Sequence, residues 1–296
     1  MSSTQASKTA EIAAAVRAAH RRYDHPVVFD DPHALALTSP AWRAIVRSRV
    51  LHRLVVRRLL ADFRSIHAEM LGRARFAEEE LLRAVAGGLG QYVIIGAGLD
   101  SFALRHRELA PQLRVFELDH PASQAVKIER LAKITTEPLA HVEFIAADLE
   151  HETVATALAR SGYDRGAPAF FAWLGNTYYL TPEAIAGTLR GIAGLAAPGS
   201  ELVLDYALPV EQQPPEERRA FLKAQAAVER RGEPWRAFFT PPQFARLARE
   251  CGFELMATLS PAEQLQRYFS GRSDGLRPPA WGHFAHLRLM RWQTVP

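Results

Sequence analysis

Gly96 and Gly98 lie at the end of a short apolar run in the segment QYVIIGAGLDSFALRH, residues 91–106. Glycines at such a point let the backbone turn tightly and approach a ligand with no Cβ in the way. A buried strand that passes through a glycine turn into a helix is typical of a parallel sheet that binds a nucleotide. The segment therefore predicts a loop that holds a nucleotide-like ligand.

The residues around this loop bear on the kind of ligand. The dinucleotide pattern GxGxxG requires a third glycine at position 101, where this chain has Ser101. Asp100 lies near the place where a pyrophosphate would sit, and a carboxylate is unfavourable beside an anion. An adenosine ligand with no phosphate and with a cationic end suits the loop better than a dinucleotide.

Acidic residues end the next predicted strand, in the sequence VFELDHP. Glu117 and Asp119 point to the same face because side chains alternate along a strand. Asp119 lies at the tip, about twenty residues after the glycines, where a carboxylate can accept hydrogen bonds from both hydroxyls of a ribose. The alternative is that Asp119 caps the helix that follows. We expect ribose binding, since the glycines and the acid occur together.

Polar residues also follow the third and fourth predicted strands. In the sequence AADL, Asp148 can accept a hydrogen bond from an adenine amino group while Leu149 packs on the ring. In the sequence WLGNTYYL, an apolar strand leads into Asn176, Tyr178 and Tyr179. We expect these three side chains to orient the molecule that reacts, although one tyrosine can equally pack in the core.

The elements that position these residues alternate between strands and helices from residue 91 onward. Strands are predicted at 92–96, 113–119, 142–149, 169–175, 200–208, 253–260 and 283–292, and helices at 121–134, 152–162, 181–196 and 240–253. This alternation predicts an α/β fold with a mostly parallel sheet covered on both faces. The link between the last two strands is too short for a helical crossover, so we expect that pair to be antiparallel.

The part before residue 89 is rich in alanine, arginine and leucine at helical spacing. It predicts an N-terminal helical lid over 1–88, followed by a ligand-binding α/β domain over 89–296, both in one integrated unit. One helix should start at Asp31-Pro32, an N-cap followed by proline, and a long one should span 65–86. Residues 209–239 are a helical insertion at the carboxyl ends of the strands, where ligands bind in open α/β sheets.

The composition is that of a soluble globular protein, with 48% hydrophobic and 23% charged residues. The N-terminus lacks a secretory signal and no apolar run is long enough to cross a bilayer, so we expect a cytoplasmic protein with no membrane partner. Cys251 is the single cysteine, which excludes an internal disulfide and a cysteine-based metal site. We expect no metal and no nucleic-acid partner.

The segment 42–64, WRAIVRSRVLHRLVVRRLLADFR, interleaves arginines with apolar residues at helical spacing. Such a helix can lie on an acidic surface. It can also be a packing helix of the lid whose arginines are solvated, and we expect this second arrangement.

Four stretches, GAGLDSFALR, VFELDHPASQAVKIERL, AADL and WLGNTYYLTPEAI, resemble in order and spacing the leucine carboxyl methyltransferase family. These are S-adenosylmethionine-dependent methyltransferases, and the likeness is nearest to a bacterial branch that includes polyketide O-methyltransferases of secondary metabolism. RAAHRRYDHPVVFDDPHAL and GRARFAEEELL are similar to the same branch. The resemblance covers about residues 15–260.

The resemblance implies a class I methyltransferase fold, which is Rossmann-like, with seven strands of which the last is antiparallel. It implies S-adenosylmethionine as cofactor and S-adenosylhomocysteine as product, with Arg73 or Arg75 at the methionine carboxylate. The cofactor-binding residues so implied are Arg73, Arg75, Gly96, Ala97, Gly98, Asp100, Asp119, His120, Asp148, Leu149 and Leu174. Members that methylate protein carboxyl groups carry a glutamate where this chain has Leu174, so we expect a small-molecule acceptor.

We therefore expect an O-methyltransferase that acts on a carboxylate oxygen of a small acceptor, or alternatively on a phenol or other hydroxyl. A carboxylate is ionised at pH 7 and needs no base, whereas a hydroxyl benefits from one. Histidine is the usual base, and no histidine of the sequence forms an obvious dyad with a carboxylate, which favours the carboxylate acceptor. The acceptor pocket is expected to include Tyr23, Tyr178, Trp235, Phe238 and Phe239, an aromatic lining that suits a polyketide or other planar acid.

A nicotinamide-dependent oxidoreductase of the Rossmann type is the alternative class of enzyme. It would share the glycine loop and the ribose acid. However, neither Tyr178 nor Tyr179 is followed four residues later by the lysine of a Tyr-x-x-x-Lys pair, since those positions hold Pro182 and Glu183. A monomer and a homodimer both remain open.

Overall fold

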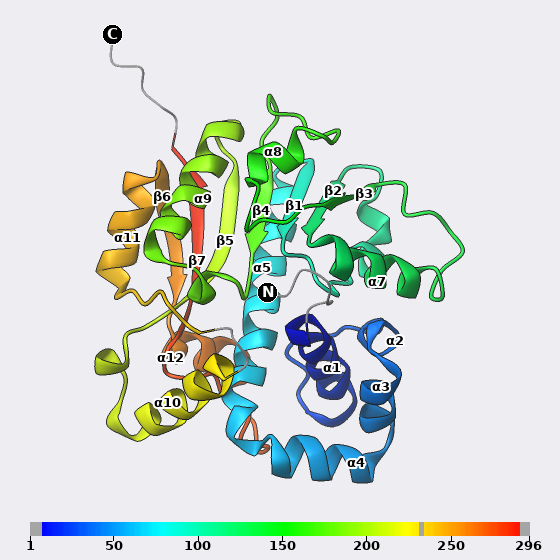
Figure 1. Cartoon of the computed structure of the whole chain (residues 1–296), viewed down its shortest axis with the longest axis vertical. Helices are drawn as coiled ribbons and strands as arrows, with labels where there is room; N and C mark the ends of the chain where they lie inside the picture. Colours follow the sequence, from blue (N-terminus) through cyan, green and yellow to red (C-terminus); the bar gives the residue numbers. More distant parts are fainter. Residues whose placement is uncertain (1–7, 231–233, 291–296) are drawn as a thin grey trace.

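A seven-stranded sheet forms the centre of the computed structural model, which describes residues 8–230 and 234–290 (Figure 1). The strands are β1 (Gln91–Ile95), β2 (Arg114–Asp119), β3 (Val142–Ala146), β4 (Phe170–Trp173), β5 (Glu201–Ala207), β6 (Phe253–Leu259) and β7 (Gly282–Leu289). All seven predicted strands and the α/β class are confirmed. The last two residues of the predicted 283–292 strand lie outside the described residues.

The sheet has the order β3-β2-β1-β4-β5-β7-β6. Neighbouring strands from β3 to β5 are parallel, while β7 is antiparallel to both β5 and β6. The expected antiparallel closing pair is thus confirmed, with β7 inserted between β5 and the edge strand β6. The chain order reverses between β1 and β4, and ligands of open α/β sheets bind at the carboxyl ends of the strands at such a point.

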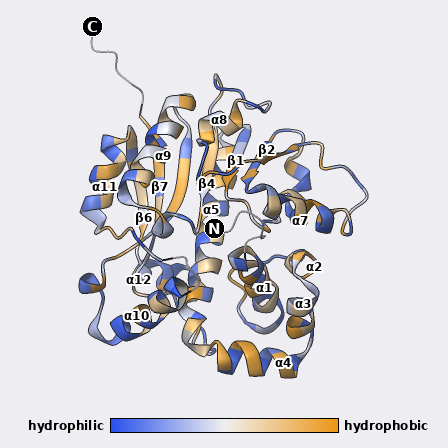
Figure 2. Ribbon diagram, viewed as in Figure 1, coloured by the Kyte–Doolittle hydropathy of each residue, from blue (hydrophilic) through white to orange (hydrophobic). Residues whose placement is uncertain are grey.

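Strand β1 shows why the sheet is covered on both faces. Val93 and Ile95 pack in one apolar cluster, while Tyr92 and Ile94 pack in another on the opposite side. All five residues of the strand are buried, so neither of its faces is exposed to solvent. The central strands accordingly form the apolar centre of the molecule (Figure 2).

Helices cover the sheet and extend beyond the carboxyl ends of its strands (Figure 1). The α-helices are α1 (Lys8–Tyr23), α2 (Ala34–Leu37), α3 (Pro40–Arg47), α4 (Arg49–Leu54), α5 (Arg64–Ala86), α6 (Phe102–Arg105), α7 (Pro121–Leu131), α8 (Val154–Leu158), α9 (Pro182–Leu195), α10 (Pro215–Glu229), α11 (Pro241–Glu250) and α12 (Pro261–Gln264). Short 3₁₀ or π turns are η1 (Val55–Leu59), η2 (Ala61–Phe63), η3 (Arg107–Leu109), η4 (Thr177–Tyr179), η5 (Val210–Gln212) and η6 (Leu265–Phe269). None of the helices in these described ranges is long and apolar enough to span a membrane.

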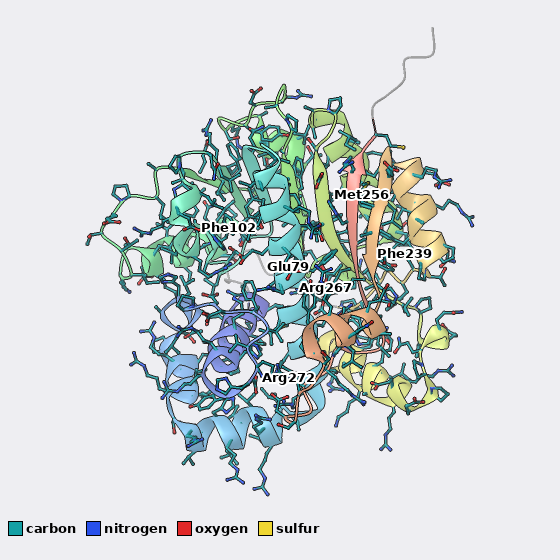
Figure 3. The ribbon with its side chains drawn as sticks, turned by 180° about the vertical axis from the view of Figure 1, so that it is seen from behind. Glu79, Phe102, Phe239, Met256, Arg267 and Arg272 are labelled. Carbon is teal, nitrogen blue, oxygen red and sulfur yellow. The ribbon has the colours of Figure 1, made fainter. Side chains whose placement is uncertain are left out.

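Helix α5 confirms the predicted 65–86 helix and links the lid to the sheet. It contacts α1 near one end and β4, β5 and β7 along its length. Seen from behind, α5 lies over the face of the sheet, and Glu79 faces Arg267 of η6 (Figure 3). The Arg267 guanidinium donates to the Glu79 carboxylate at 2.6 Å. The N-cap of α9 is also as predicted, since the Thr181 hydroxyl accepts from the N–H of Ala184 at 3.2 Å.

Two helix predictions in the lid need correction. The helix expected to start at Asp31-Pro32 begins at Ala34, although the Asp31 carboxylate accepts the N–H groups of His33 and Ala34 as the predicted N-cap would. The segment 42–64 is not one helix but breaks at Ser48, whose hydroxyl caps α4 by accepting from Leu51 N–H. In the insertion 209–239, η5 and α10 are helical as expected, while residues 231–233 lie outside the described residues.

Candidate active site

The glycine loop and the loop after β4 meet at the point where the strand order reverses. Gly96 has φ +72°, and a Cβ there would lie 2.7 Å from the side-chain nitrogen of Asn176. The Asn176 amide donates to the carbonyl of Leu174 at 3.0 Å, which fixes it across the ends of β1 and β4. An L side chain at position 96 is therefore disfavoured both by its backbone conformation and by this contact.

Asp119 holds the glycine loop from the tip of β2. Its carboxylate accepts the N–H of Gly98 at 2.5 Å and the N–H of His120 at 2.7 Å. Burial raises the pKa of Asp119 against the opposing effect of these two donors. His120, not Asp119, is the N-cap of α7, since its ring nitrogen accepts from Ala122 N–H. Helix capping therefore does not explain Asp119, whose oxygens keep lone pairs for further donors.

Hydrogen bonds link the carboxyl ends of β1, β2 and β3 through Asp119. Ala147 N–H, just after β3, donates to the carbonyl of Asp119 at 2.8 Å. Asp148 follows, and a hydrogen bond from His151 together with the N–H of Glu150 lowers the pKa of its carboxyl. Leu149 is 36% exposed beside it and offers an apolar surface.

The other residues predicted around the loop have local roles. The Asp100 carboxylate accepts the N–H of Phe102 at 2.7 Å in the turn before α6, whose N-cap is Ser101. Ala97 is buried, and Leu174 packs against the same apolar cluster as α5. Gly98 has φ +52°, and a Cβ there would lie 3.0 Å from the Cβ of Ala10 on α1. The first turn of the lid helix therefore covers the glycine loop.

The two arginines proposed for a carboxylate lie in different surroundings. Arg75 is half exposed and pairs with Glu79 on the helix surface. Arg73 is largely buried at the carboxyl ends of β4 and β5, where its Nη1 donates to the Tyr178 hydroxyl at 2.5 Å. Gly175 has φ +73°, and a Cβ there would collide with the Arg73 guanidinium. Arg73, unlike Arg75, thus lies next to the loop that contacts Gly96.

Two carboxyl groups that sequence reasoning missed surround Arg73. Glu69, one turn earlier on α5, and Asp205, in the middle of β5, lie 3.2 and 3.3 Å from Arg73 Nη1. Asp205 also accepts the N–H of Gly175 at 2.7 Å. Both acids are about 1% exposed. A single acid in the apolar run LVLDYAL was the signal that could have revealed Asp205. We refer to Glu69, Arg73, Tyr178 and Asp205 as the Arg73 cluster.

The Arg73 cluster contains two carboxyl groups but only one guanidinium. Burial and the neighbouring Asp205 raise the pKa of Glu69 to about 8. Burial opposes the charge of Arg73, but Glu69, Tyr178 and Asp205 outweigh it and raise the pKa of the guanidinium. Burial also raises the pKa of Tyr178, so its phenol stays neutral. Near pH 7 the cluster therefore carries a proton on its acid pair, which a cationic ligand group can displace.

The proton on Glu69 makes stability depend on pH. Because the pKa is about 4.5 when unfolded and about 8 when folded, the folded protein binds the extra proton between these values. We therefore expect the free energy of unfolding to fall as pH rises from 5 to 8. Urea unfolding of Glu69→Gln should lack this slope, whereas the same change at Glu79 should keep it. An unchanged slope in Glu69→Gln would contradict the assignment.

The aromatic residues predicted for the acceptor pocket are only partly brought together. Tyr178, Trp235 and Phe238 share one cluster with Phe221 and Trp281. The ring centroids of Tyr178 and Trp235 lie 5.6 Å apart, and those of Trp235 and Trp281 lie 4.9 Å apart. The indole nitrogen of Trp235 is buried and has no hydrogen-bond partner among the residues that the structure describes. This cluster adjoins the Arg73 cluster through Tyr178.

The other two predicted pocket residues lie elsewhere. Phe239 packs in the core against Phe244. Tyr23 stacks on His52 in the lid with ring centroids 4.0 Å apart, and its hydroxyl donates to the carbonyl of Val46. Tyr179 forms an edge contact with Tyr178.

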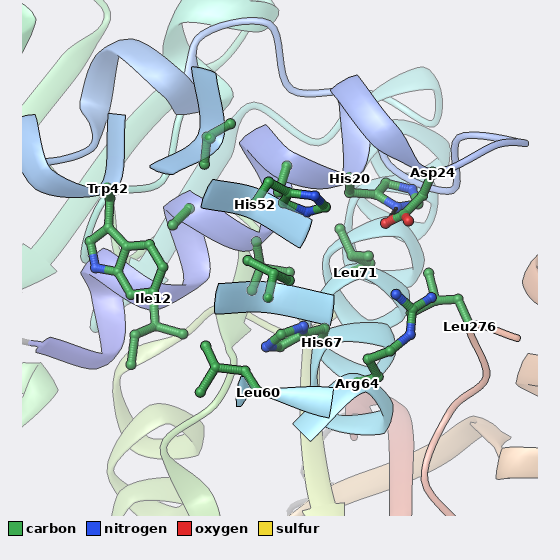
Figure 4. Close-up of a pocket in the computed structure, with 15 residues that line it drawn as sticks. Ile12, His20, Asp24, Trp42, His52, Leu60, Arg64, His67, Leu71 and Leu276 are labelled. Carbon is green, nitrogen blue, oxygen red and sulfur yellow. Dashed lines mark hydrogen bonds and ion pairs between the residues drawn. The ribbon is translucent and has the colours of Figure 1, made fainter. Parts of the chain in front are cut away.

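The expectation that no histidine pairs with a carboxylate is wrong. His20 is buried, with Nδ1 3.1 Å from Asp24 and Nε2 accepting from Val28 N–H, so both ring nitrogens are occupied. Together with His52 and His67 it lines a cavity of about 30 Å³ inside the lid (Figure 4). Burial and the charge of Arg64 lower the pKa of His67 to about 4. A cavity of this size holds one or two water molecules.

Comparison with known proteins supports the methyltransferase expectation over the oxidoreductase alternative. YktD of Bacillus subtilis (strain 168), which is named as an S-adenosyl-L-methionine-dependent methyltransferase, is 31% identical over 97% of this chain and 99% of its own length. A DUF574-family protein from Streptomyces avermitilis superposes with TM-score 0.63 at 14% identity, covering 97% of this chain and 98% of the other. A protein from Thermobifida fusca YX named as a methyltransferase gives TM-score 0.56 at 17% identity, covering 98% and 97%.

The likeness to the two solved structures concerns the fold, which is that of the class I methyltransferases. The sequence profile of the leucine carboxyl methyltransferase family matches residues 10–193, a stretch that includes the glycine loop, Asp119, Asp148 and Arg73. The chain therefore belongs to the leucine carboxyl methyltransferase family and is an S-adenosylmethionine-dependent methyltransferase.

Proposed function

We propose that this enzyme methylates an oxygen of a small aromatic acceptor, with a carboxylate oxygen as the favoured site. One observation carries the proposal. The buried indole nitrogen of Trp235 has no hydrogen-bond partner within residues 8–230 and 234–290, and it lies in an aromatic cluster that reaches the Arg73 cluster through Tyr178. A planar acceptor that bears an oxygen would satisfy this donor and pack on the neighbouring rings.

We further propose which residues hold the cofactor. The glycine loop, covered by α1 and lacking room for side chains, suits a ligand that approaches the backbone closely. Asp119 would accept from the ribose hydroxyls, and Asp148 and Leu149 would contact the adenine. Arg73 would pair with the methionine carboxylate, because it lies against the loop after β4 and Arg75 does not.

The acid pair of the Arg73 cluster would then face the methionine ammonium. An amino acid carries both charges, so a guanidinium beside two carboxyl groups matches it. This would replace the glutamate that protein-methylating members carry where this chain has Leu174. The residues present therefore fit S-adenosylmethionine.

When bound, S-adenosylmethionine supplies a methyl group that is already strongly electrophilic. The chain's own task is to hold the acceptor oxygen in line with that methyl and to exclude water. The closely packed rings of Tyr178, Trp235 and Trp281 would do both. A carboxylate acceptor requires orientation but no base.

A hydroxyl acceptor is the second candidate, because Glu69 gives the site a carboxyl group whose pKa is about 8. A base of that pKa can take a proton from a phenol near neutral pH. The two candidates differ in their pH dependence. With the cofactor bound, methylation of a carboxylate should be nearly constant from pH 6 to 9, whereas methylation of a phenol should rise with pH as Glu69 ionises, at a pH that the methionine ammonium moves below 8.

Replacement of Trp235 by phenylalanine tests the acceptor site. It keeps an aromatic ring but removes the N–H, so we expect KM for an aromatic acid to rise by about tenfold, the value of one buried hydrogen bond. The Kd of S-adenosylhomocysteine should stay within about twofold. Trp42→Phe, in the lid cavity, is the matched control and should change neither value. Equal loss of cofactor and acceptor binding in Trp235→Phe would contradict the proposal.

A further inference from the structure

The outer side of the lid carries exposed apolar residues that the methyltransferase site does not use. Val50 is 76% exposed, Leu54 48% and Leu59 70%, and Leu51 is 40% exposed. These four belong to the continuous helical stretch of α4 and η1, and they are a third of the twelve large apolar residues that are strongly exposed in the described part of the chain. Exposed apolar side chains gathered on one short element mark an interaction surface.

The same stretch is strongly basic. Residues 32–61 contain six arginines and neither aspartate nor glutamate. Two of these arginines are occupied within the fold, since Arg43 donates to lid carbonyls and Arg57 pairs with Asp24. The other four, Arg47, Arg49, Arg53 and Arg58, are exposed and have no acidic partner among the described residues. The surface thus combines apolar side chains with unneutralised positive charge.

The position of the stretch makes it accessible. Helix α4 lies at the end of the molecule farthest from the sheet, where it forms an apolar strip at the periphery (Figure 2). Its inner side is fully used, because His52, Val56 and Leu60 line the lid cavity. The stretch therefore has apolar residues on both sides. One set packs inward against the lid cavity, and the other is exposed to solvent between the arginines.

We propose that α4 and η1 dock the enzyme on an anionic lipid surface. A helix whose leucines and valines enter the acyl boundary while flanking arginines meet lipid phosphates is the usual form of such docking. A second copy of the chain is a poorer occupant, because a symmetric contact would bring the same unpaired arginines face to face. An acidic protein would pair with the arginines, but that pairing alone would not account for the exposed apolar side chains beside them.

Vesicle co-sedimentation of the full-length enzyme tests this proposal. We expect binding to vesicles that mix phosphatidylcholine and phosphatidylglycerol, and little binding to phosphatidylcholine alone. The double variant Val50→Asp and Leu59→Asp should lower the apparent affinity for the mixed vesicles by at least about tenfold. Because both residues are exposed, its melting temperature and its affinity for S-adenosylhomocysteine should match the wild type. Leu222→Asp, an equally drastic change at a 50% exposed leucine on α10, should bind as the wild type does.

Two further measurements distinguish the lipid surface from the other candidate partners. The double variant Arg49→Glu and Arg53→Glu should lose binding to the anionic vesicles, and salt should weaken wild-type binding. The proposal is overturned if the aspartate double variant binds mixed vesicles as the wild type does. It is also overturned if light scattering finds a wild-type dimer that the double variant converts to a monomer, since the strip would then be a contact between copies.

Discussion

The Arg73→Lys enzyme is expected to bind S-adenosylhomocysteine at least about a hundredfold more weakly than the wild type. Arg73 is the cation of a buried cluster with two carboxyl groups, and the methionine carboxylate would be its remaining partner. Lysine keeps the charge but cannot present two parallel N–H groups. Each charged hydrogen bond contributes about 1.5–3 kcal/mol, and about 2.7 kcal/mol corresponds to a hundredfold change.

Lysine is chosen over alanine because removing the charge leaves two buried acids unpaired, which costs about 3–5 kcal/mol of stability. Binding is measured by calorimetry after the melting temperature has been checked. The internal control is 5′-methylthioadenosine, which lacks the amino-acid end and should bind both enzymes within about threefold. Arg75→Lys, on the exposed side of the same helix, should behave as the wild type. A hundredfold loss in Arg75→Lys and none in Arg73→Lys would reverse the assignment.

Asp119→Asn is expected to weaken S-adenosylhomocysteine and 5′-methylthioadenosine by similar factors of about a hundred. Both ligands contain the ribose, and the carboxylate is the group that would receive its hydroxyls. The amide has one acceptor oxygen in place of two, so its NH₂ would face the N–H of Gly98 or of His120. Two effects should therefore lower the affinity together: the loss of charged hydrogen bonds to the ribose and the displacement of the glycine loop.

Asp148→Asn is the matched control for this change. Its carboxyl is more exposed and is already engaged by His151, so the expected loss is below about fivefold. The two ligands also distinguish Asp119 from Arg73. Asp119→Asn should weaken both ligands, whereas Arg73→Lys should weaken only S-adenosylhomocysteine, which has the amino-acid end. Full affinity for both ligands in Asp119→Asn would remove Asp119 from the binding site.

Local sequence patterns were sufficient to predict the seven-stranded sheet and its closing antiparallel pair. The apolar runs gave the seven strands, and the short last link gave the antiparallel pairing, because both depend on residues close in the chain. Thr181 followed by proline predicted the start of α9 for the same reason. The positions of Gly96, Asp119 and Asp148 at neighbouring strand tips also followed from the order of the elements.

The Arg73 cluster could not be predicted in this way. Glu69 and Asp205 are 136 positions apart in numbering, and their meeting depends on how α5 crosses β5. The His20–Asp24 pair was missed for a different reason, since the spacing was visible but burial of the ring was not. In the lid, helical spacing predicted a helix but did not predict that Val50, Leu54 and Leu59 stay exposed on it.

Calorimetric titration of the wild-type enzyme with S-adenosylmethionine, S-adenosylhomocysteine and NADH tests the central claim most directly. That claim is that the glycine loop, Asp119 and the Arg73 cluster hold an adenosine ligand with an amino-acid end. We predict micromolar binding of the first two ligands and no detectable binding of NADH. We also predict that S-adenosylhomocysteine releases protons at pH 7, seen as a dependence of the binding enthalpy on the buffer, because its ammonium displaces the proton on Glu69. Binding of NADH without binding of S-adenosylhomocysteine would contradict the account.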